Sequence, residues 1–180
     1  MEKIIVVDIE ATCWDTSPPI GEENEIIEIG ICVLDTSTGD IDKNEGILIK
    51  PQRSKVSPFC TQLTTLTQEM VSTGILFKNA CLMLQTEYDT KNYTWASYGD
   101  YDLNMFRKQC ESFSVEYPFG KEHINVKNLF AQKHHLTYKG VGMAAALKRL
   151  NIPLEGTHHR GVDDAKNIAK ILFTLVSGKK

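Results

Sequence analysis

A short apolar run near the N-terminus constrains the fold of this chain most strongly. From Lys3 to Ile9, a lysine is followed by four β-branched residues in succession, then by an aspartate and an isoleucine. Short runs of this composition are typical of strands in the interior of a sheet. We therefore expect this run to form a buried central strand.

Two carboxylates are tied to this strand. Asp8 is expected at its C-terminal end, and Glu10 follows two residues later. In extended chain, residues two apart project to the same side, so both carboxylates would face one site. Strands often end in acidic residues that simply enter solvent. Two acids on one side of a central strand repel each other unless a cation lies between them, so we favour a metal-binding role.

The following segments predict the edge of the same sheet. Residues 25–34 and 41–49 are β-prone, and the turn cluster at 36–40 would join them as a hairpin. A hairpin after a central strand gives the sheet an antiparallel edge. The aromatic-rich residues 93–98 indicate a further strand, and residues 15–24, with two prolines and a glycine, indicate a surface loop.

Helical spacing predicts longer helices in the rest of the chain. They are expected at residues 75–88, from about Asp102 onward, and at 125–134, 141–150 and 164–176. The hydroxyl-bearing residues between 57 and 67 suggest caps and short helical turns instead. No repeat or long linker interrupts the pattern, so residues 1–180 are expected to be a single α/β domain with helices flanking the sheet.

Composition limits the cellular setting. Hydrophobic residues make up 42% and charged residues 24% of the chain, which describes a soluble globular protein. No apolar run approaches the ~20 residues that span a bilayer, and the N-terminus lacks the pattern of a signal peptide. Five scattered cysteines without a C-x-x-C pair argue against a disulfide scaffold or a thiolate zinc site. We expect a cytoplasmic protein with Cys32 and Cys81 in its core.

The net charge of the chain does not decide whether its partner is a nucleic acid. The formal charge of −3 gives no basic footprint of the usual nucleic-acid-binding kind. However, carboxylates that bind divalent cations would reverse the sign locally. Overall charge therefore neither supports nor excludes a nucleic-acid substrate.

Two further junctions between predicted elements contain candidate metal ligands. Asp100 and Asp102 lie where the strand at 93–98 gives way to a helix, and ligands of open α/β sheets collect outside strand carboxyl ends. Capping of the helix is the alternative role for either aspartate. Near the C-terminus, a loop with His158 and His159 precedes a helix that begins near Asp163 and Asp164, so either histidine and either aspartate could be the working pair. His134 and His135, being adjacent, are expected on the surface.

Four acids at strand ends and a helix start, with a histidine in the preceding loop, match a two-metal phosphodiester-cleaving site. Mg²⁺ and Mn²⁺ prefer hard oxygen ligands. Two such ions, about 3.5–4 Å apart, can hold the attacking water and the leaving oxygen on either side of one phosphate. A histidine near its unperturbed pKa of about 6.5 can accept the proton of the water at neutral pH.

The chain resembles the DEDDh branch of the DnaQ-like (RNase T-like) 3′→5′ exonucleases. The resemblance lies in the order of three motifs: Asp8-x-Glu10, Tyr101-Asp102 and His159-x₄-Asp164. Longer matching stretches are similar to the subgroup of 3′ histone-mRNA and small-interfering-RNA exonucleases and bacterial KapD-type proteins; they lie at residues 8–13, 25–30, 59–64 and 161–169. The resemblance covers nearly the whole chain. It implies an RNase H-like mixed sheet, with central parallel strands and an antiparallel hairpin edge.

The resemblance also assigns roles to residues. It implies that the metal ligands for two Mg²⁺ or Mn²⁺ ions are Asp8, Glu10, Asp102 and Asp164. His159 would be the general base, with Glu10 also catalytic. The pattern chooses Asp102 over Asp100, and it leaves Asp163 and His158 as neighbours with structural roles. From its place in the second strand, Glu28 is expected to be solvated or paired and is given no catalytic role.

A nucleoside pocket is the third implication. The substrate-binding residues would be Ile9, Ala11, Thr12, Phe59, Leu63, Tyr101 and His159. From spacing alone, Phe59 and Leu63 share a helical face that more simply packs inward. The resemblance favours the pocket, because stacking of a base on an aromatic ring contributes about 1–3 kcal/mol and tolerates any base. The resemblance departs at Thr65, where the family often has glycine, which leaves the shape of the substrate loop open.

The expected function is a metal-dependent 3′→5′ exonuclease on single-stranded 3′ ends, of RNA more than DNA, releasing 5′-mononucleotides. One alternative is a KapD-type regulatory or binding protein that keeps the exonuclease fold. A related endonuclease of RNase H-like architecture is another. No membrane partner is expected, whereas a homodimer or a regulatory protein partner is left open.

Overall fold

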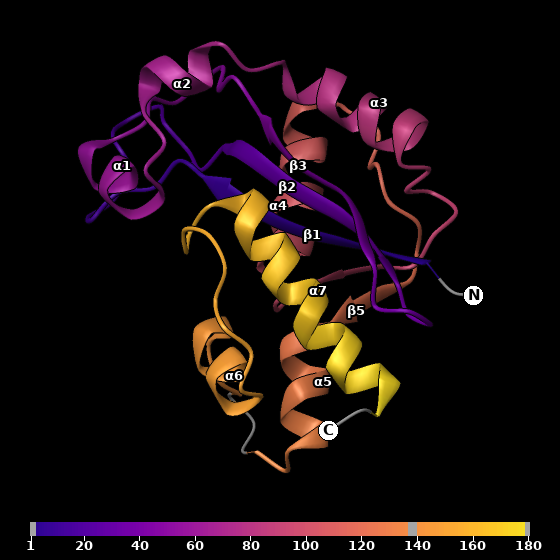
Figure 1. The fold of residues 1–180 in the computed structure, drawn as a ribbon. Coiled ribbons are helices and arrows are strands. Elements are labelled where there is room, and N and C mark those ends of the chain that lie inside the picture. Colours follow the sequence, from indigo (N-terminus) through magenta and orange to yellow (C-terminus); the bar gives the residue numbers. More distant parts are fainter. Residues whose placement is uncertain (1–2, 137–139, 179–180) are drawn as a thin grey trace.

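The computed structural model of the chain describes residues 3–136 and 140–178 (Figure 1). The described part contains five strands: β1 (Lys3–Ala11), β2 (Ile26–Asp35), β3 (Ile41–Leu48), β4 (Trp95–Ser97) and β5 (His123–Asn125). It also contains seven helices: α1 (Pro58–Thr64), α2 (Gln68–Ser72), α3 (Phe77–Glu87), α4 (Tyr101–Phe113), α5 (Val126–Lys133), α6 (Met143–Arg149) and α7 (Gly161–Ser177).

The strands form one mixed sheet in the order β3-β2-β1-β4-β5. β1 pairs antiparallel with β2 and parallel with β4, while β3 pairs antiparallel with β2, and β5 parallel with β4. The central position of β1 and the hairpin edge are therefore confirmed. The short strand β5 is a feature that the sequence did not predict, because three residues are too few to show a period of two.

The first strand is longer than predicted. It continues to Ala11, because β2 remains paired alongside it up to the Ala11–Ile26 pair, with a register shift after Glu10. Asp8 and Glu10 therefore lie within the strand instead of at and beyond its end. Their rigid backbone fixes the direction of both carboxylates.

Helices cover the sheet on both faces (Figure 1). Ile5, Val7 and Ile9 belong to a hydrophobic cluster with α3 and α4. Ile4 and Val6 belong to a second cluster with α5, α6 and α7 on the opposite face. Asp8 and Glu10 share the parity of Ile4 and Val6, so alternation along the strand directs them to the face covered by α7.

The last helix begins three residues earlier than predicted, at Gly161 instead of Asp164. Its first turn lies directly on the backbone of β2. A Cβ atom added to Gly30 would overlap the carbonyl group of Gly161. Two glycines thus allow a helix start and a strand to meet backbone to backbone, which was not readable from hydrophobic spacing.

The remaining predictions agree with the structure to within two residues at the helix ends. Residues 57–67 contain the short helix α1, capped by the side chain of Ser57, and end at Thr67, whose side chain caps the short helix α2. Cys32 and Cys81 are buried, and all five cysteines are free thiols. His134 and His135 are exposed, as predicted. Among the described residues, no helix has the length and apolar character needed to cross a membrane.

Candidate active site

Three of the four predicted metal ligands converge where β1 meets the start of α7. One carboxylate oxygen from each of Asp8, Glu10 and Asp164 lies within 4.8 Å of the other two. Glu10 and Asp164 are only 8% and 4% exposed. The structure therefore brings together carboxylates separated by more than 150 residues in sequence, in a spacing suited to a divalent cation.

Asp102 reaches the same cavity from the first turn of α4. On the β4 side of β1, the amide of Ile5 donates to the carbonyl of Thr94. Ile9 has the same parity, but β4 ends at Ser97 and leaves its amide without a strand partner. The Oδ1 atom of Asp102 accepts this N–H at 3.0 Å. Asp100 is the N-cap residue without a side-chain capping bond, and it does not line this cavity.

The four carboxyl groups share an electrostatic environment that disfavours their ionised forms. Burial, together with the neighbouring Asp102, Glu10 and Asp164, raises the pKa of Asp8 well above its ordinary value. Burial and the nearby Asp164 raise the pKa of Glu10 to about 8. Burial raises the pKa of Asp102 to about 6, against the hydrogen bond from Ile9. Mutual repulsion of this kind is relieved by a bound cation, which supports a metal site.

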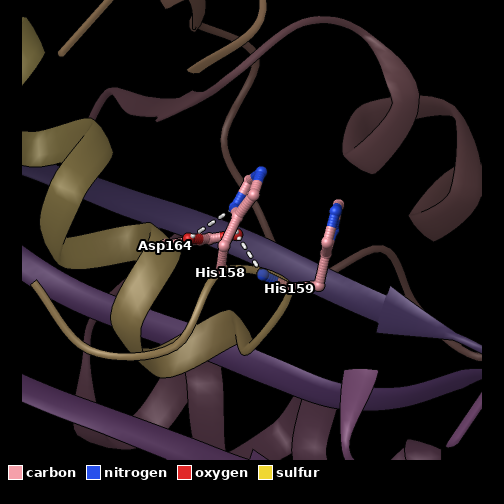
Figure 2. Close-up of side chains that lie close together, drawn as sticks. All are labelled: His158, His159 and Asp164. Atoms are coloured by element: carbon pink, nitrogen blue, oxygen red, sulfur yellow. Dashed lines mark hydrogen bonds and ion pairs between the residues drawn. The ribbon is translucent and has the colours of Figure 1, made fainter. Parts of the chain in front are cut away.

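The segment before α7 places two imidazoles beside Asp164 (Figure 2). The Nδ1 atom of His158 lies 3.0 Å from Oδ2 and 3.3 Å from Oδ1 of Asp164. The backbone N–H of His159 donates to the same Oδ2 atom at 2.9 Å. The two rings stack on each other with a centroid separation of 4.0 Å. Asp164 is thus held by the loop that precedes α7. It does not cap the helix, although its predicted position at the helix start had suggested a cap.

His159 has the properties that a general base needs. Burial and the adjacent His158 lower its pKa below the ordinary value of 6.5, against the attraction of Asp164. The ring is therefore mostly neutral at neutral pH and can accept a proton. Its backbone has a φ of +65°, a left-handed conformation that turns its amide back toward Asp164.

A salt bridge anchors the segment that carries these groups. Glu28 of β2 is fully buried and accepts hydrogen bonds from the guanidinium of Arg160 at 2.8 Å and 3.2 Å, and from the amide of Gly161 at 2.7 Å. Of the two states expected for Glu28, solvated or paired, the structure shows the paired one. Asp163 similarly has a structural contact, because it accepts the amide of Thr157 at 2.8 Å.

A cavity of about 410 Å³ opens over the carboxylates. Among the predicted substrate residues, those that line it are Ile9, Ala11, Leu63, Tyr101 and His159. Residues that sequence reasoning did not place there are Cys13, Tyr98, Gly142, Met143 and His158. Most of these come from segments whose approach depends on tertiary packing, although the adjacency of His158 to His159 was a usable signal.

Two predicted substrate residues do not line this cavity. Thr12 is buried, and its hydroxyl donates to the carbonyl of Glu23 and accepts the amide of Glu25. Phe59 lies on the same helix as Leu63, and both side chains are nearly 40% exposed, so the helix does not pack this face inward. Contact of Thr12 or Phe59 with a nucleoside stays a prediction.

Comparison with known proteins identifies the family. The family model described as exonuclease, of the RNase T type, matches residues 5–172. The chain belongs to this exonuclease family. The predicted resemblance to the DEDDh exonucleases and the RNase H-like mixed sheet are both confirmed by the matches.

The chain is similar to human 3′-5′ exoribonuclease 1, with 31% identity over 182 residues that cover 96% of this chain and 52% of the human protein. It thus spans about half the length of that relative. A crystal structure of the nuclease domain of 3′hExo, a DEDDh family member bound to rAMP, superposes with a TM-score of 0.85 and 28% identity, covering 98% and 92% of the two chains. A 3′-exonuclease structure that concerns 3′-end recognition of a histone mRNA stem-loop superposes with a TM-score of 0.86 and 26% identity, covering 98% and 82%.

Proposed function

We propose that this chain is a metal-dependent 3′→5′ exonuclease that removes 5′-mononucleotides from single-stranded 3′ ends, with RNA preferred over DNA. The observation that carries the proposal is the meeting of Asp8, Glu10 and Asp164 within 4.8 Å, beside Asp102 and His159 in one cavity. The name of the human relative and the rAMP bound to the related nuclease domain support RNA as the substrate.

The donor set fits two divalent ions such as Mg²⁺ or Mn²⁺. Asp8, Glu10, Asp102 and Asp164 offer only hard carboxylate oxygens, which are the ligands these ions prefer. Mutual repulsion among the acids gives the protein a reason to take up cations here. Two bound ions would supply charge that stabilises the attacking water and the leaving oxygen.

The remaining groups act on the substrate and on protons. His159 accepts the proton of the attacking water, since burial keeps its imidazole neutral at neutral pH. Leu63 and Tyr101 provide an apolar wall for the terminal nucleoside, because they line the cavity and stay partly exposed. A wall of this kind holds any base, which suits stepwise removal of successive nucleotides.

The test uses matched RNA and DNA oligonucleotides with free or blocked 3′ ends, incubated with Mg²⁺ or Mn²⁺. We expect shortening from the free 3′ end with release of 5′-mononucleotides, and faster shortening of RNA. Asp8→Asn should lower the rate by about 1000-fold or more, because a lost ligand removes several kcal/mol of charge stabilisation. His159→Ala should lower it by about 10²–10⁴-fold while leaving metal affinity largely intact.

Two results would contradict the proposal. Cleavage of a covalently closed circular RNA would indicate an endonuclease, since an exonuclease must begin at an end. Shortening that survives Asp8→Asn would place the chemistry elsewhere or in a contaminant. If the wild type shows no nuclease activity and instead co-purifies with a stoichiometric protein partner, the regulatory alternative gains support.

The cellular setting is also a proposal. We infer a cytoplasmic location, and the five free cysteines support a reducing compartment.

A further inference from the structure

His158 is a titratable, metal-ligating side chain that the proposed reaction does not use. It lies in the loop before α7, and its side chain is 40% exposed while that of Asp164 is 5% exposed. Its Nδ1 atom contacts the carboxylate of Asp164, and its ring stacks on His159 (Figure 2). This arrangement forms a second cluster of metal ligands at the mouth of the cavity.

We propose that His158, His159 and Asp164 form a site for a borderline divalent ion such as Zn²⁺, which overlaps the carboxylate site through Asp164 and whose occupation inhibits the exonuclease. One ligand atom from each residue lies within 4.8 Å of the other two. His158 belongs to this cluster alone, whereas Asp164 belongs to both.

The donor set selects the class of ion. Imidazole nitrogen suits Zn²⁺, Ni²⁺ and Cu²⁺, whereas Mg²⁺ prefers oxygen ligands. Two histidines and one carboxylate, with a fourth position left for water, is a recognised ligand set for zinc. Excess Mg²⁺ would therefore fill the carboxylates of Asp8 and Glu10 without competing strongly for the two imidazoles.

The distances are close to those of a tetrahedral site. Zinc bonds of about 2.0–2.1 Å to nitrogen and oxygen separate two tetrahedral ligand atoms by about 3.3 Å. The Nδ1 atom of His158 lies 3.3 Å from Oδ1 and 3.0 Å from Oδ2 of Asp164. An ion can take the place of the hydrogen bond along this edge, and a nitrogen of the stacked His159 ring, within 4.8 Å of both other ligand atoms, supplies the third bond after side-chain adjustment.

The surroundings hold the carboxylate in place and leave a route for the ion. The Oδ2 atom of Asp164 also accepts the backbone N–H of His159, which fixes the orientation of the carboxylate beside His158. His158 provides the solvent-facing side of the cluster. A zinc site therefore requires only side-chain adjustments in a loop that already brings the ligands together.

The inhibitory effect rests on the proposed exonuclease function. An ion bound here would occupy the imidazole of His159, the proposed general base, and would share Asp164 with the carboxylate site. Both effects slow hydrolysis even when Mg²⁺ is saturating. Binding itself does not depend on the reaction, so it can be tested separately.

The binding test uses Co²⁺ as a spectroscopic substitute for Zn²⁺, in excess Mg²⁺, with the purified full chain. Tetrahedral Co²⁺ with nitrogen ligands absorbs visible light much more strongly than octahedral Co²⁺ with oxygen ligands. We expect an intense band that saturates at one equivalent and that Zn²⁺ abolishes. His158→Gln should weaken this binding by about 10-fold or more, since it removes one of three protein ligands. The control His134→Gln alters an exposed histidine at the C-cap of α5 and should bind as the wild type does.

The activity test measures inhibition by Zn²⁺ relative to the uninhibited rate of each variant. His158→Gln should need about 10-fold more Zn²⁺ for half-inhibition than the wild type or His134→Gln. Equal Co²⁺ binding, or equal sensitivity to Zn²⁺, in the wild type and His158→Gln would overturn the proposal and place the ion at the carboxylates. A protein without nuclease activity that still shows the His158-dependent band would refute only the proposed function.

Discussion

At the scale of single residues, the active-site carboxyl groups keep their protons to a higher pH than usual when no metal is bound. Burial raises the pKa of Glu10 to about 8, well above its ordinary value of 4.5. The pKa values of Asp8, Asp102 and Asp164 are also raised, first by burial. The folded protein without metal therefore binds more protons than the unfolded chain over the window from about pH 4.5 to about pH 8.

The sign of the stability change follows from this imbalance. Where the folded state holds more protons, the free energy of unfolding decreases as pH rises. Groups with lowered pKa values act differently: Glu23 and Glu155 titrate below pH 4.5, and His159 titrates below 6.5. The window from about pH 7 to about pH 8 therefore contains the contribution of Glu10 and its neighbours, and it lies below the ordinary thiol pKa of 9.0 from which the cysteines are shifted.

We expect the melting temperature of the metal-free protein in EDTA to fall between about pH 7 and pH 8. Saturating Mg²⁺ or Mn²⁺ should reverse or abolish the fall, because the ions replace the protons. Glu10→Gln should flatten the dependence in EDTA, since the substituted side chain does not ionise. A melting temperature that rises with pH in EDTA would contradict the raised pKa values.

At the scale of secondary-structure elements, the end of α1 explains a departure from the family pattern. Thr65, which stands where the family often has glycine, is the C-cap residue and has a φ of +64°. This left-handed conformation costs a residue other than glycine about 1–2 kcal/mol, and β-branched residues adopt it least readily. Thr65 therefore holds, at the cost of local strain, a backbone conformation that glycine adopts freely.

Thr65→Gly should therefore stabilise the protein by about 1 kcal/mol, since the relief of strain exceeds the added flexibility of the unfolded chain. Urea denaturation followed by circular dichroism measures the change. The matched control is Thr61→Gly within the same helix, which should destabilise by about 1 kcal/mol because glycine is a poor helix former. Destabilisation by Thr65→Gly would show that the threonine side chain makes a contact that outweighs the strain.

The packing of α7 against β2 is a second feature at the scale of secondary-structure elements. The backbone approach at Gly30 and Gly161 and the buried pair of Glu28 with Arg160 fix where the first turn of the helix lies. Asp164 projects from this turn toward Asp8 and Glu10. The active-site geometry therefore depends on a contact in which no catalytic group takes part.

Gly30→Ala should shift the start of α7 and cost about 2–3 kcal/mol of stability, the upper part of the range for overpacking, because backbone atoms must move. Metal affinity should fall with it, as measured by calorimetric titration with Mn²⁺ under folded conditions. Gly142→Ala provides the control, since a Cβ atom there meets no neighbour and the residue has no left-handed backbone. Unchanged stability and Mn²⁺ affinity in Gly30→Ala would refute the role of this contact.

At the scale of the whole molecule, β1 belongs to both hydrophobic layers. Its odd-numbered residues pack with α3 and α4, and its even-numbered residues with α5, α6 and α7. Neither layer can lose its packing without exposing one face of this strand. The domain is therefore expected to unfold as a single cooperative unit.

Equilibrium unfolding in urea tests this expectation with two probes. Trp95 is fully buried against Phe119 in the layer of α3 and α4, so in a Trp14→Phe background its fluorescence reports that side. Far-ultraviolet circular dichroism is dominated by all the helices, including the long α7. The two transitions should coincide at one midpoint. Separate midpoints would show that the layers unfold independently.

The sequence by itself determined the central strand and the direction of its acids. A period of two along β1 places Asp8 and Glu10 on one side wherever the strand lies, because alternation is a local property of extended chain. The choice of His159 and Asp164 came from their spacing in the family motif, and the likeness to the exonuclease family confirms that resemblance. These features depend on neighbours in sequence or on motif order.

Only the tertiary structure decided how the pieces meet. The early start of α7 and its glycine contact with β2 depend on atoms from segments far apart in the chain. The contact of His158 with Asp164 depends on the exact path of a loop. Likewise, Tyr98 and Met143 reach the cavity because packing brings α6 beside the end of β4, and no local pattern encodes that approach. Alternation and helical spacing specify which way a side chain points, whereas the packing of backbones against one another specifies what it meets.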